Sequence, residues 1–349
     1  MFRCKSVLLL GAAVALSLSA APGLATPAQP LYKIYKTVAL GAPGRWDYLH
    51  FDPQSGRIYL AHGDRITVAN GTTGAILGSI TGMPGGTHGI AISHTTGQGF
   101  TDDGKAGQAV AFDLKTLKVV KRMKAEPDAD GIIYDHASRH IFVIDGDSGK
   151  LTVIDPKVDK VIATIDGGGG LEFGVSGDNG KLYINGVEKH EIVRIDTATN
   201  EADAHWVMPT CERPRGLAID RIHERLFSTC TNEKMIVLNA DNGAIVATLP
   251  IGKGSDAAGF DVTRQLVFSS NFAGTLSVVH ELAPNKFETL PVVKTALGAR
   301  TMALDPKSGR IYLVAANIIV NPSAAPADYH HRYHVAPGSA KLYILEPTR

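Results

Sequence analysis

A repeat of about 42 residues runs along nearly the whole chain, and it restricts the fold more than any other feature. Each copy holds four short stretches rich in Val, Ile, Thr and aromatic residues, separated by turns rich in Gly, Asp, Asn and Pro. The second stretch of each copy carries an aromatic residue, and consecutive aromatics are 41 to 44 residues apart. These aromatics are Tyr59, Phe100, Phe142, Tyr183, Phe227, Phe268 and Tyr312.

Seven units of four short strands are typical of β-propeller blades. No long segment shows helical periodicity, and a β-solenoid usually has shorter repeats. We therefore expect an all-β, seven-bladed β-propeller. The stretch Leu31–Leu40 reads as an additional strand. We expect it to join the last blade beside Lys341–Leu345 and so close the ring, which protects strand edges.

The N-terminus has the order of a secretory signal peptide. Arg3 and Lys5 precede an uncharged apolar run, and Gly23 and Ala25 suit cleavage after Ala25. We expect a signal peptide at 1–25 and a single propeller domain at 26–349. Without the signal the chain has 33 basic and 34 acidic residues, which gives no strong nucleic-acid signal. We expect a periplasmic or secreted monomer without a membrane span.

Two long phrases, 141–166 and 226–252, resemble the YVTN-type repeat of YncE-like propellers. The second strand of that repeat typically reads Val-Tyr-Val-Thr-Asn, and here Leu182–Asn185 and Leu266–Asn271 are similar to it. The resemblance covers most of the mature chain. It implies a seven-bladed fold, a bacterial exported protein and a binding or interaction role. It transfers no catalytic residue.

The start of each innermost strand should lie at one mouth of the central channel. Counting back five positions from the Asp position that ends this strand reaches a polar, ionisable residue in every copy. We expect these residues to surround the mouth and bind a ligand there: Asp47, His88, Asp130, Glu172, Arg215, Asp256 and Arg300.

This ring admits more than one interpretation. Glu172 with Arg215, and Asp256 with Arg300, lie on adjacent blades, so acid–arginine pairing alone would account for much of it. Converging charges in a concave site also suit a small polar ligand, a metal ion or the charged tip of a partner. The four carboxylates would suit Ca²⁺ or acid–base chemistry of the lactonase type, although the two arginines weaken a site built only for cations.

An insertion at about 318–339 in the last copy should project over the same mouth. It contains His330, His331 and His334, which would bind Zn²⁺ or Cu²⁺ if the loop folded around the ion. A solvated polar loop is the simpler interpretation. Residues that would complete a metal site from the same face are His62, His88, Asp103 and Asp145.

Two cysteines remain after the signal, and neither is part of a CxxC motif. Cys211 precedes an innermost strand and Cys230 ends the antiparallel strand that follows. Both should lie near the same face, so we expect a disulfide in an oxidising compartment.

Three functions remain open. The first, which the sequence favours, is a non-enzymatic binding or scaffold protein that engages a small ligand or a periplasmic protein at the channel mouth. The second is a metal-dependent, lactonase-like hydrolase. The third is an accessory of a periplasmic metal or redox system. The cofactor is open as well, and Zn, Cu and Ca are the candidate ions.

Overall fold

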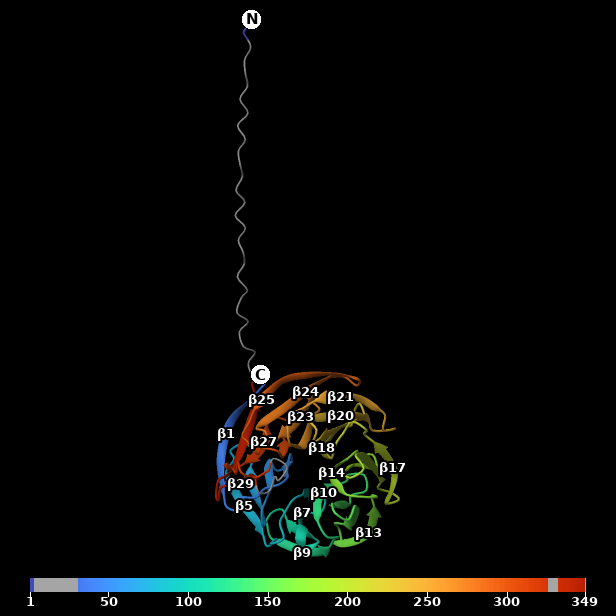
Figure 1. Cartoon of the computed structure of the whole chain (residues 1–349). Helices are drawn as coiled ribbons and strands as arrows, with labels where there is room; N and C mark the ends of the chain where they lie inside the picture. The colour runs from blue at the N-terminus through green and yellow to red at the C-terminus, as the bar shows by residue number, and fades with distance from the viewer. Residues whose placement is uncertain (3–30, 326–331, 349) are drawn as a thin grey trace.

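The computed structural model describes residues 1–2, 31–325 and 332–348. The expected signal peptide lies almost wholly outside the described residues, as do His330 and His331. Seven four-stranded antiparallel sheets surround a common centre as the blades of a propeller (Figure 1). The expected all-β, seven-bladed fold is therefore confirmed. Across the described ranges no helix is long and apolar enough to cross a membrane.

Blades 1 to 6 each use four consecutive strands, numbered from the centre outwards. Blade 1 has β2 (Leu49–Asp52), β3 (Arg57–His62), β4 (Arg65–Asn70) and β5 (Ile76–Thr81). Blade 2 has β6 (Ile90–Ser93), β7 (Gln98–Asp103), β8 (Gln108–Asp113) and β9 (Val119–Lys124). Blade 3 has β10 (Ala129–Tyr134), β11 (Ile141–Asp145), β12 (Lys150–Asp155) and β13 (Lys160–Asp166).

The second half of the ring repeats this order. Blade 4 has β14 (Leu171–Ser176), β15 (Lys181–Gly186), β16 (Glu191–Asp196) and β17 (Glu201–Val207). Blade 5 has β18 (Pro214–Asp220), β19 (Arg225–Cys230), β20 (Lys234–Asn239) and β21 (Ile245–Pro250). Blade 6 has β22 (Ser255–Asp261), β23 (Leu266–Asn271), β24 (Thr275–Ala283) and β25 (Lys286–Lys294).

Blade 7 combines both ends of the propeller. Its strands are β26 (Met302–Leu304), β27 (Ile311–Ala315), β30 (Ala340–Pro347) and, outermost, β1 (Tyr32–Gly41). The register of β1 against β30 runs from Tyr32 opposite Pro347 to Gly41 opposite Ala340. In Figure 1 the blue β1 accordingly lies on the outside of the red last blade. The insertion between β27 and β30 contains a small hairpin of β28 (Ile318–Val320) and β29 (Tyr333–Val335).

The hydrophobic core lies between neighbouring blades. All seven aromatics of the repeat are buried in it, each with 3% exposure or less. Two of them also hydrogen bond to the next blade: the Tyr183 hydroxyl donates to the carbonyl of Ala240, and the Tyr312 hydroxyl to that of Gly71. These bulky, closely packed rings define one arrangement of each sheet against the next.

The Asp position at the end of each innermost strand organises the turn that follows. Asp52 accepts a hydrogen bond from the backbone NH of Gln54, and Asp261 accepts bonds from Thr263 and Arg264. Such Asx turns hold the start of the second strand in place. Because this turn recurs among the blades, a fixed number of residues separates the Asp position from the start of the innermost strand.

Cys211 and Cys230 form a disulfide, as expected from the sequence. Cys230 ends β19, and Cys211 lies just before β18, to which β19 is paired. Both are buried in the core between blades 4 and 5.

The first prediction concerns β1. Replacing Tyr32 with alanine should lower the free energy of unfolding by about 3–5 kcal/mol, because this buried ring packs edge-to-face on Phe268 of blade 6. Tyr35 in the same strand is exposed, so Tyr35→Ala should change stability by about 0.5 kcal/mol or less. Urea unfolding measures both. Equal midpoints for the two variants would show that β1 does not hold the ring together.

The second prediction concerns the disulfide. The bridged cysteines are 19 positions apart, and a loop of this length should stabilise the fold by about 3 kcal/mol in the chain-entropy model. Replacing both cysteines with serine should lower the unfolding midpoint accordingly. Thiol titration of the denatured, unreduced protein is the direct check. Two free thiols in material from an oxidising compartment would contradict the pairing.

Candidate ligand-binding site at the channel mouth

All seven charged residues predicted for the channel mouth line one cavity of about 660 Å³. Asp130, Glu172, Arg215 and Asp256 belong to the first residues of the innermost strands, and the other three lie two residues before such a strand. The repeat places one of them at the same height in every blade. Their role in ligand binding stays a prediction.

Two aromatic residues cross the channel from opposite blades at the level of Glu172. The Tyr48 hydroxyl of blade 1 donates to Glu172 Oε1 of blade 4 at 3.2 Å. The rings of Tyr48 and Phe173 are in contact, with centroids 4.6 Å apart. This contact places apolar surface beneath part of the charged ring, where a ligand would be shielded from water.

Both arginines of the ring form ion pairs with carboxylates of neighbouring blades. Arg215 forms a short contact with Glu172. Arg300 lies 2.9 Å from Asp256 and 4.0 Å from Asp47. These are the two pairs expected from the sequence. Each arginine therefore holds a carboxylate in place and offsets part of its charge.

His88 forms a dyad with a residue that the sequence analysis missed. Its Nδ1 lies 2.6 Å from Oδ2 of Asp102, whose other oxygen accepts the backbone NH groups of His88 and Gly89. Burial alone would lower the pKa of His88, but the hydrogen bond and charge of Asp102 raise it to about 10. Asp102 thus fixes the ring orientation, as carboxylates do for functional histidines.

Asp47, Asp130 and Glu172 of the ring hold their protons more strongly than ordinary carboxyl groups do. Burial raises the pKa of Asp47 to about 6 and that of Glu172 to about 7, although Arg300 and Arg215 oppose these shifts. Burial, followed by the charge of Asp47, raises the pKa of Asp130 well above its ordinary value. The protonation state of the cavity therefore changes within the physiological pH range.

Carboxylates outnumber cationic groups in the cavity. Three acidic side chains and one arginine join the predicted ring, and sequence counting missed them because they belong to loops beyond the innermost strands. The acidic residues that line the cavity are Asp47, Asp128, Asp130, Asp147, Glu172, Glu188 and Asp256. The basic ones are His88, Arg213, Arg215 and Arg300. At pH values above the raised pKa values of Asp47 and Glu172, this excess of carboxylates favours a cationic ligand over an anionic one.

Asp47, His88 and Asp130 come closest to a metal-binding arrangement at the mouth. One ligand atom from each lies within 4.8 Å of the others. Of the four residues proposed to complete a metal site from this face, His88 belongs to this group, whereas the other three have different partners. His62 bonds to Thr67 and the Pro43 carbonyl, while the buried Asp103 and Asp145 accept hydrogen bonds from Gly85 and Thr152 respectively.

The histidine-containing insertion contributes aromatic and apolar groups. Its hairpin places Ile318, Tyr333 and Val335 around a cavity of about 410 Å³ that also includes Asp47 and Arg300. Trp46 and Phe272 line the same space, and Phe272 packs edge-to-face on Tyr333. His334, the one described member of the histidine cluster, is exposed on β29. The charged mouth therefore has an aromatic wall on the side of blade 7.

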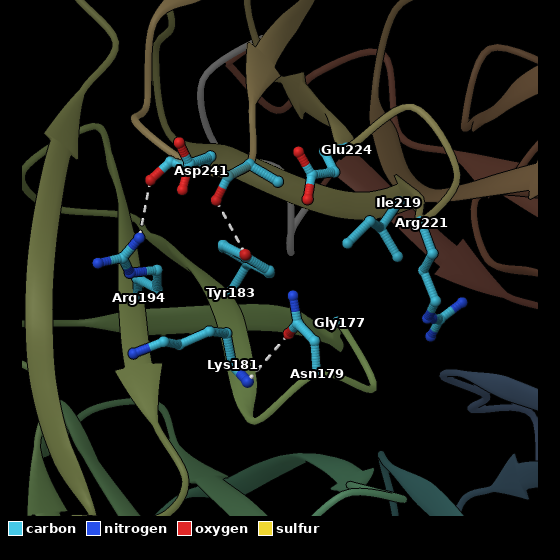
Figure 2. Close-up of a pocket in the computed structure, with 10 residues that line it drawn as sticks. Gly177, Asn179, Lys181, Tyr183, Arg194, Ile219, Arg221, Glu224 and Asp241 are labelled. Atoms are coloured by element: carbon cyan, nitrogen blue, oxygen red, sulfur yellow. Dashed lines mark hydrogen bonds between the residues drawn. The ribbon is translucent and has the colours of Figure 1, made fainter.

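A smaller cavity of about 170 Å³ lies between blades 4 and 5, at the opposite end of the strands (Figure 2). Figure 2 shows Arg194 bonded to the backbone of Asp241 and Tyr183 bonded to that of Ala240. The cations around it are already paired with acidic groups: Lys181 with Asp196 and Asp203, Arg194 with Asp203, and Arg221 with Asp178. This cavity is thus a weaker candidate for a charged ligand.

No family model and no curated protein matches this sequence. Among solved structures, the chain is similar to one in the "Crystal Structure of Mitotic Checkpoint Complex", with a TM-score of 0.72 and 14% sequence identity. The match covers 97% of this chain and 99% of the other. At this identity the likeness supports the propeller fold and nothing finer.

The third prediction tests the Glu172–Arg215 pair. Arg215→Met should lower the free energy of unfolding by about 2 kcal/mol, because it leaves a largely buried carboxylate without its counterion. The double variant Glu172→Gln/Arg215→Met should recover most of the loss. Urea unfolding at neutral pH gives all three values. A double variant as unstable as the single one would show that the arginine acts through packing, not charge.

Proposed function

We propose that this protein is an exported binding propeller of the YncE-like kind that holds a small cationic ligand at the channel mouth. The excess of carboxylates over guanidinium groups in the 660 Å³ cavity is the observation that carries the proposal. The aromatic wall of Trp46, Phe272 and Tyr333 supports an organic cation, since ammonium groups are attracted to aromatic faces.

The signal-like N-terminus and the disulfide support export to the periplasm or beyond the cell. The YVTN-like repeat supports a bacterial origin and a binding role. The charged groups converge inside a concave site. A small ligand therefore suits this cavity better than the surface of a partner protein would. We infer a monomeric binding protein that delivers or senses its ligand and performs no chemistry on it.

The fourth prediction is a charge preference. Choline and putrescine should bind and raise the melting temperature at pH 8, whereas acetate and phosphate should not. Asp47→Asn should weaken binding about tenfold, the loss expected for one charge-assisted contact, because Asp47 is ionised at pH 8. Asp241→Asn, an exposed change at the opposite end of blade 5, should leave affinity unchanged. Calorimetric titration measures each case. Stabilisation by the anions alone would overturn the proposal.

The same titration should depend on pH in a defined direction. Asp47 and Glu172, with pKa values raised to about 6 and 7, are largely neutral at pH 5 and ionised at pH 8. The groups facing Glu172, namely Arg215, Asp256, Asp47 and Tyr48, include only one permanent cation. Affinity for a cation should therefore rise with pH between 5 and 8. An affinity that falls over this range would indicate an anionic ligand.

A metal-dependent, lactonase-like hydrolase is the second candidate, favoured by the proximity of Asp47, His88 and Asp130. His88 would have to lose its proton to bind a metal ion, and its raised pKa opposes this. Lactone hydrolysis that requires Ca²⁺ or Zn²⁺ and disappears in Asp130→Asn would favour this candidate over simple binding. A metal or redox accessory role through His330, His331 and His334 stays a further proposal.

A further inference from the structure

A second cluster of ionisable residues lies between blades 5 and 6, at the end of the strands away from the charged mouth. Asp220 ends β18, His223 lies in the turn that follows, and Glu281 belongs to β24 of the next blade. His223 Nδ1 is 2.6 Å from Asp220 Oδ2 and 3.6 Å from Glu281 Oε1. One ligand atom from each residue lies within 4.8 Å of the others.

The two carboxylates are buried and poorly compensated. Both side chains have 0% exposure. Within the part of the chain that the structure describes, neither oxygen of Glu281 has a hydrogen-bond partner. A buried carboxylate without partners is costly unless another group offsets its charge.

The nearest arginine is engaged elsewhere. Arg225 is buried beside the cluster, yet its Nε donates to the carbonyl of Pro284 and its terminal nitrogens to His223, Glu224 and Asn285. Four neutral oxygens therefore take these donors, and Arg225 anchors the β24–β25 hairpin. No described hydrogen bond runs from Arg225 to either carboxylate, and His223 is the basic group in contact with both.

The cluster departs from the repeat at both positions that create it. Three residues after the Asp position, Ser55 and Ser308 bond to their Asp at 2.5 Å, and Arg264 of blade 6 pairs with Asp261 at 2.9 Å. Blade 5 has His223 there, and it is the one described case in which this residue also lies close to a carboxylate of the next blade. At the position of Glu281 no other blade has an acidic residue. The strand registers place there Gly71, Leu114, Pro156, Thr197, Ala240 and Pro347.

We propose that Asp220, His223 and Glu281 bind a divalent transition-metal ion of the Zn²⁺ type, which ties blade 5 to blade 6. One imidazole and two carboxylates are a common ligand set for Zn²⁺, with water in the fourth position. Neighbouring ligand atoms in a tetrahedral zinc site are about 3.3 Å apart, given bonds of about 2.0–2.1 Å. The His223–Glu281 distance already suits this, and the His223–Asp220 distance must open by less than about 1 Å.

His223 provides the route for the ion. Its side chain is 30% exposed, whereas both carboxylates are enclosed. The ring can turn toward solvent and exchange its 2.6 Å contact with Asp220 Oδ2 for a bond to the metal, while any proton on Nδ1 passes to water. The Oδ1 atom of Asp220 keeps its bond to the backbone NH of Ile222, so the turn is preserved.

The experiment is a titration of the chelator-treated full chain with ZnCl₂, followed by calorimetry and thermal unfolding. The wild type should bind one Zn²⁺ at this cluster with micromolar or tighter affinity, and its melting temperature should rise. Glu281→Gln should weaken that binding at least tenfold and abolish the thermal shift. Glu288→Gln, an exposed change on β25 of the same blade, should retain both.

Two further variants separate this site from others. Asp130→Asn and His334→Ala should keep the thermal shift, since Asp130 lines the channel mouth and His334 lies on β29. His223→Ser restores the residue found in blades 1 and 7, so it should fold and yet lose the shift. A wild type that binds no Zn²⁺, or a shift that survives in both Glu281→Gln and His223→Ser, would overturn the proposal.

Discussion

The packing of one aromatic ring per blade against the next blade is the constraint on which this structure depends. A four-stranded sheet of short strands cannot bury its faces alone, so each blade is stable only between two neighbours. The buried rings from Tyr59 to Tyr312 recur at nearly constant intervals along the sequence. Each blade therefore packs on the next one in the same way. Seven equal steps complete one ring, in which β1 supplies the outermost strand of blade 7.

The charged mouth follows from that regularity. Because the repeat places one charged residue at the equivalent position of every blade, all seven line one cavity. Burial raises the pKa values of Asp47 and Glu172, and Arg215 and Arg300 act as counterions to the carboxylates of neighbouring blades. The proposed cationic ligand would offset this surplus of carboxylates, whose burial lowers the stability of the protein on its own.

The sequence was sufficient for the fold and for the ring because both are consequences of the repeat. The aromatic spacing predicted seven blades, and the Asp position located residues such as Asp130 without any knowledge of side-chain geometry. The repeat does not predict contacts across the channel or between loops. Tyr48 reaches Glu172 from 124 positions away, and Asp102 reaches His88 through strand pairing that no periodicity distinguishes. The histidine insertion has no counterpart in other blades, so counting could not place Tyr333 beside Phe272.

A repeat protein also offers an internal standard against which single residues can be judged. When one blade has an unusual residue at a position of the repeat, the other six blades show which residues suffice for folding there. By that measure a serine at the position of His223 satisfies the turn, and an uncharged residue at the position of Glu281 satisfies the blade interface. Burying a second carboxylate there gains nothing for the fold by itself, because its desolvation is unfavourable and no described hydrogen bond offsets it. The proposed metal ion would offset the charge of that carboxylate, and the imidazole beside it suits a transition metal better than an alkali ion.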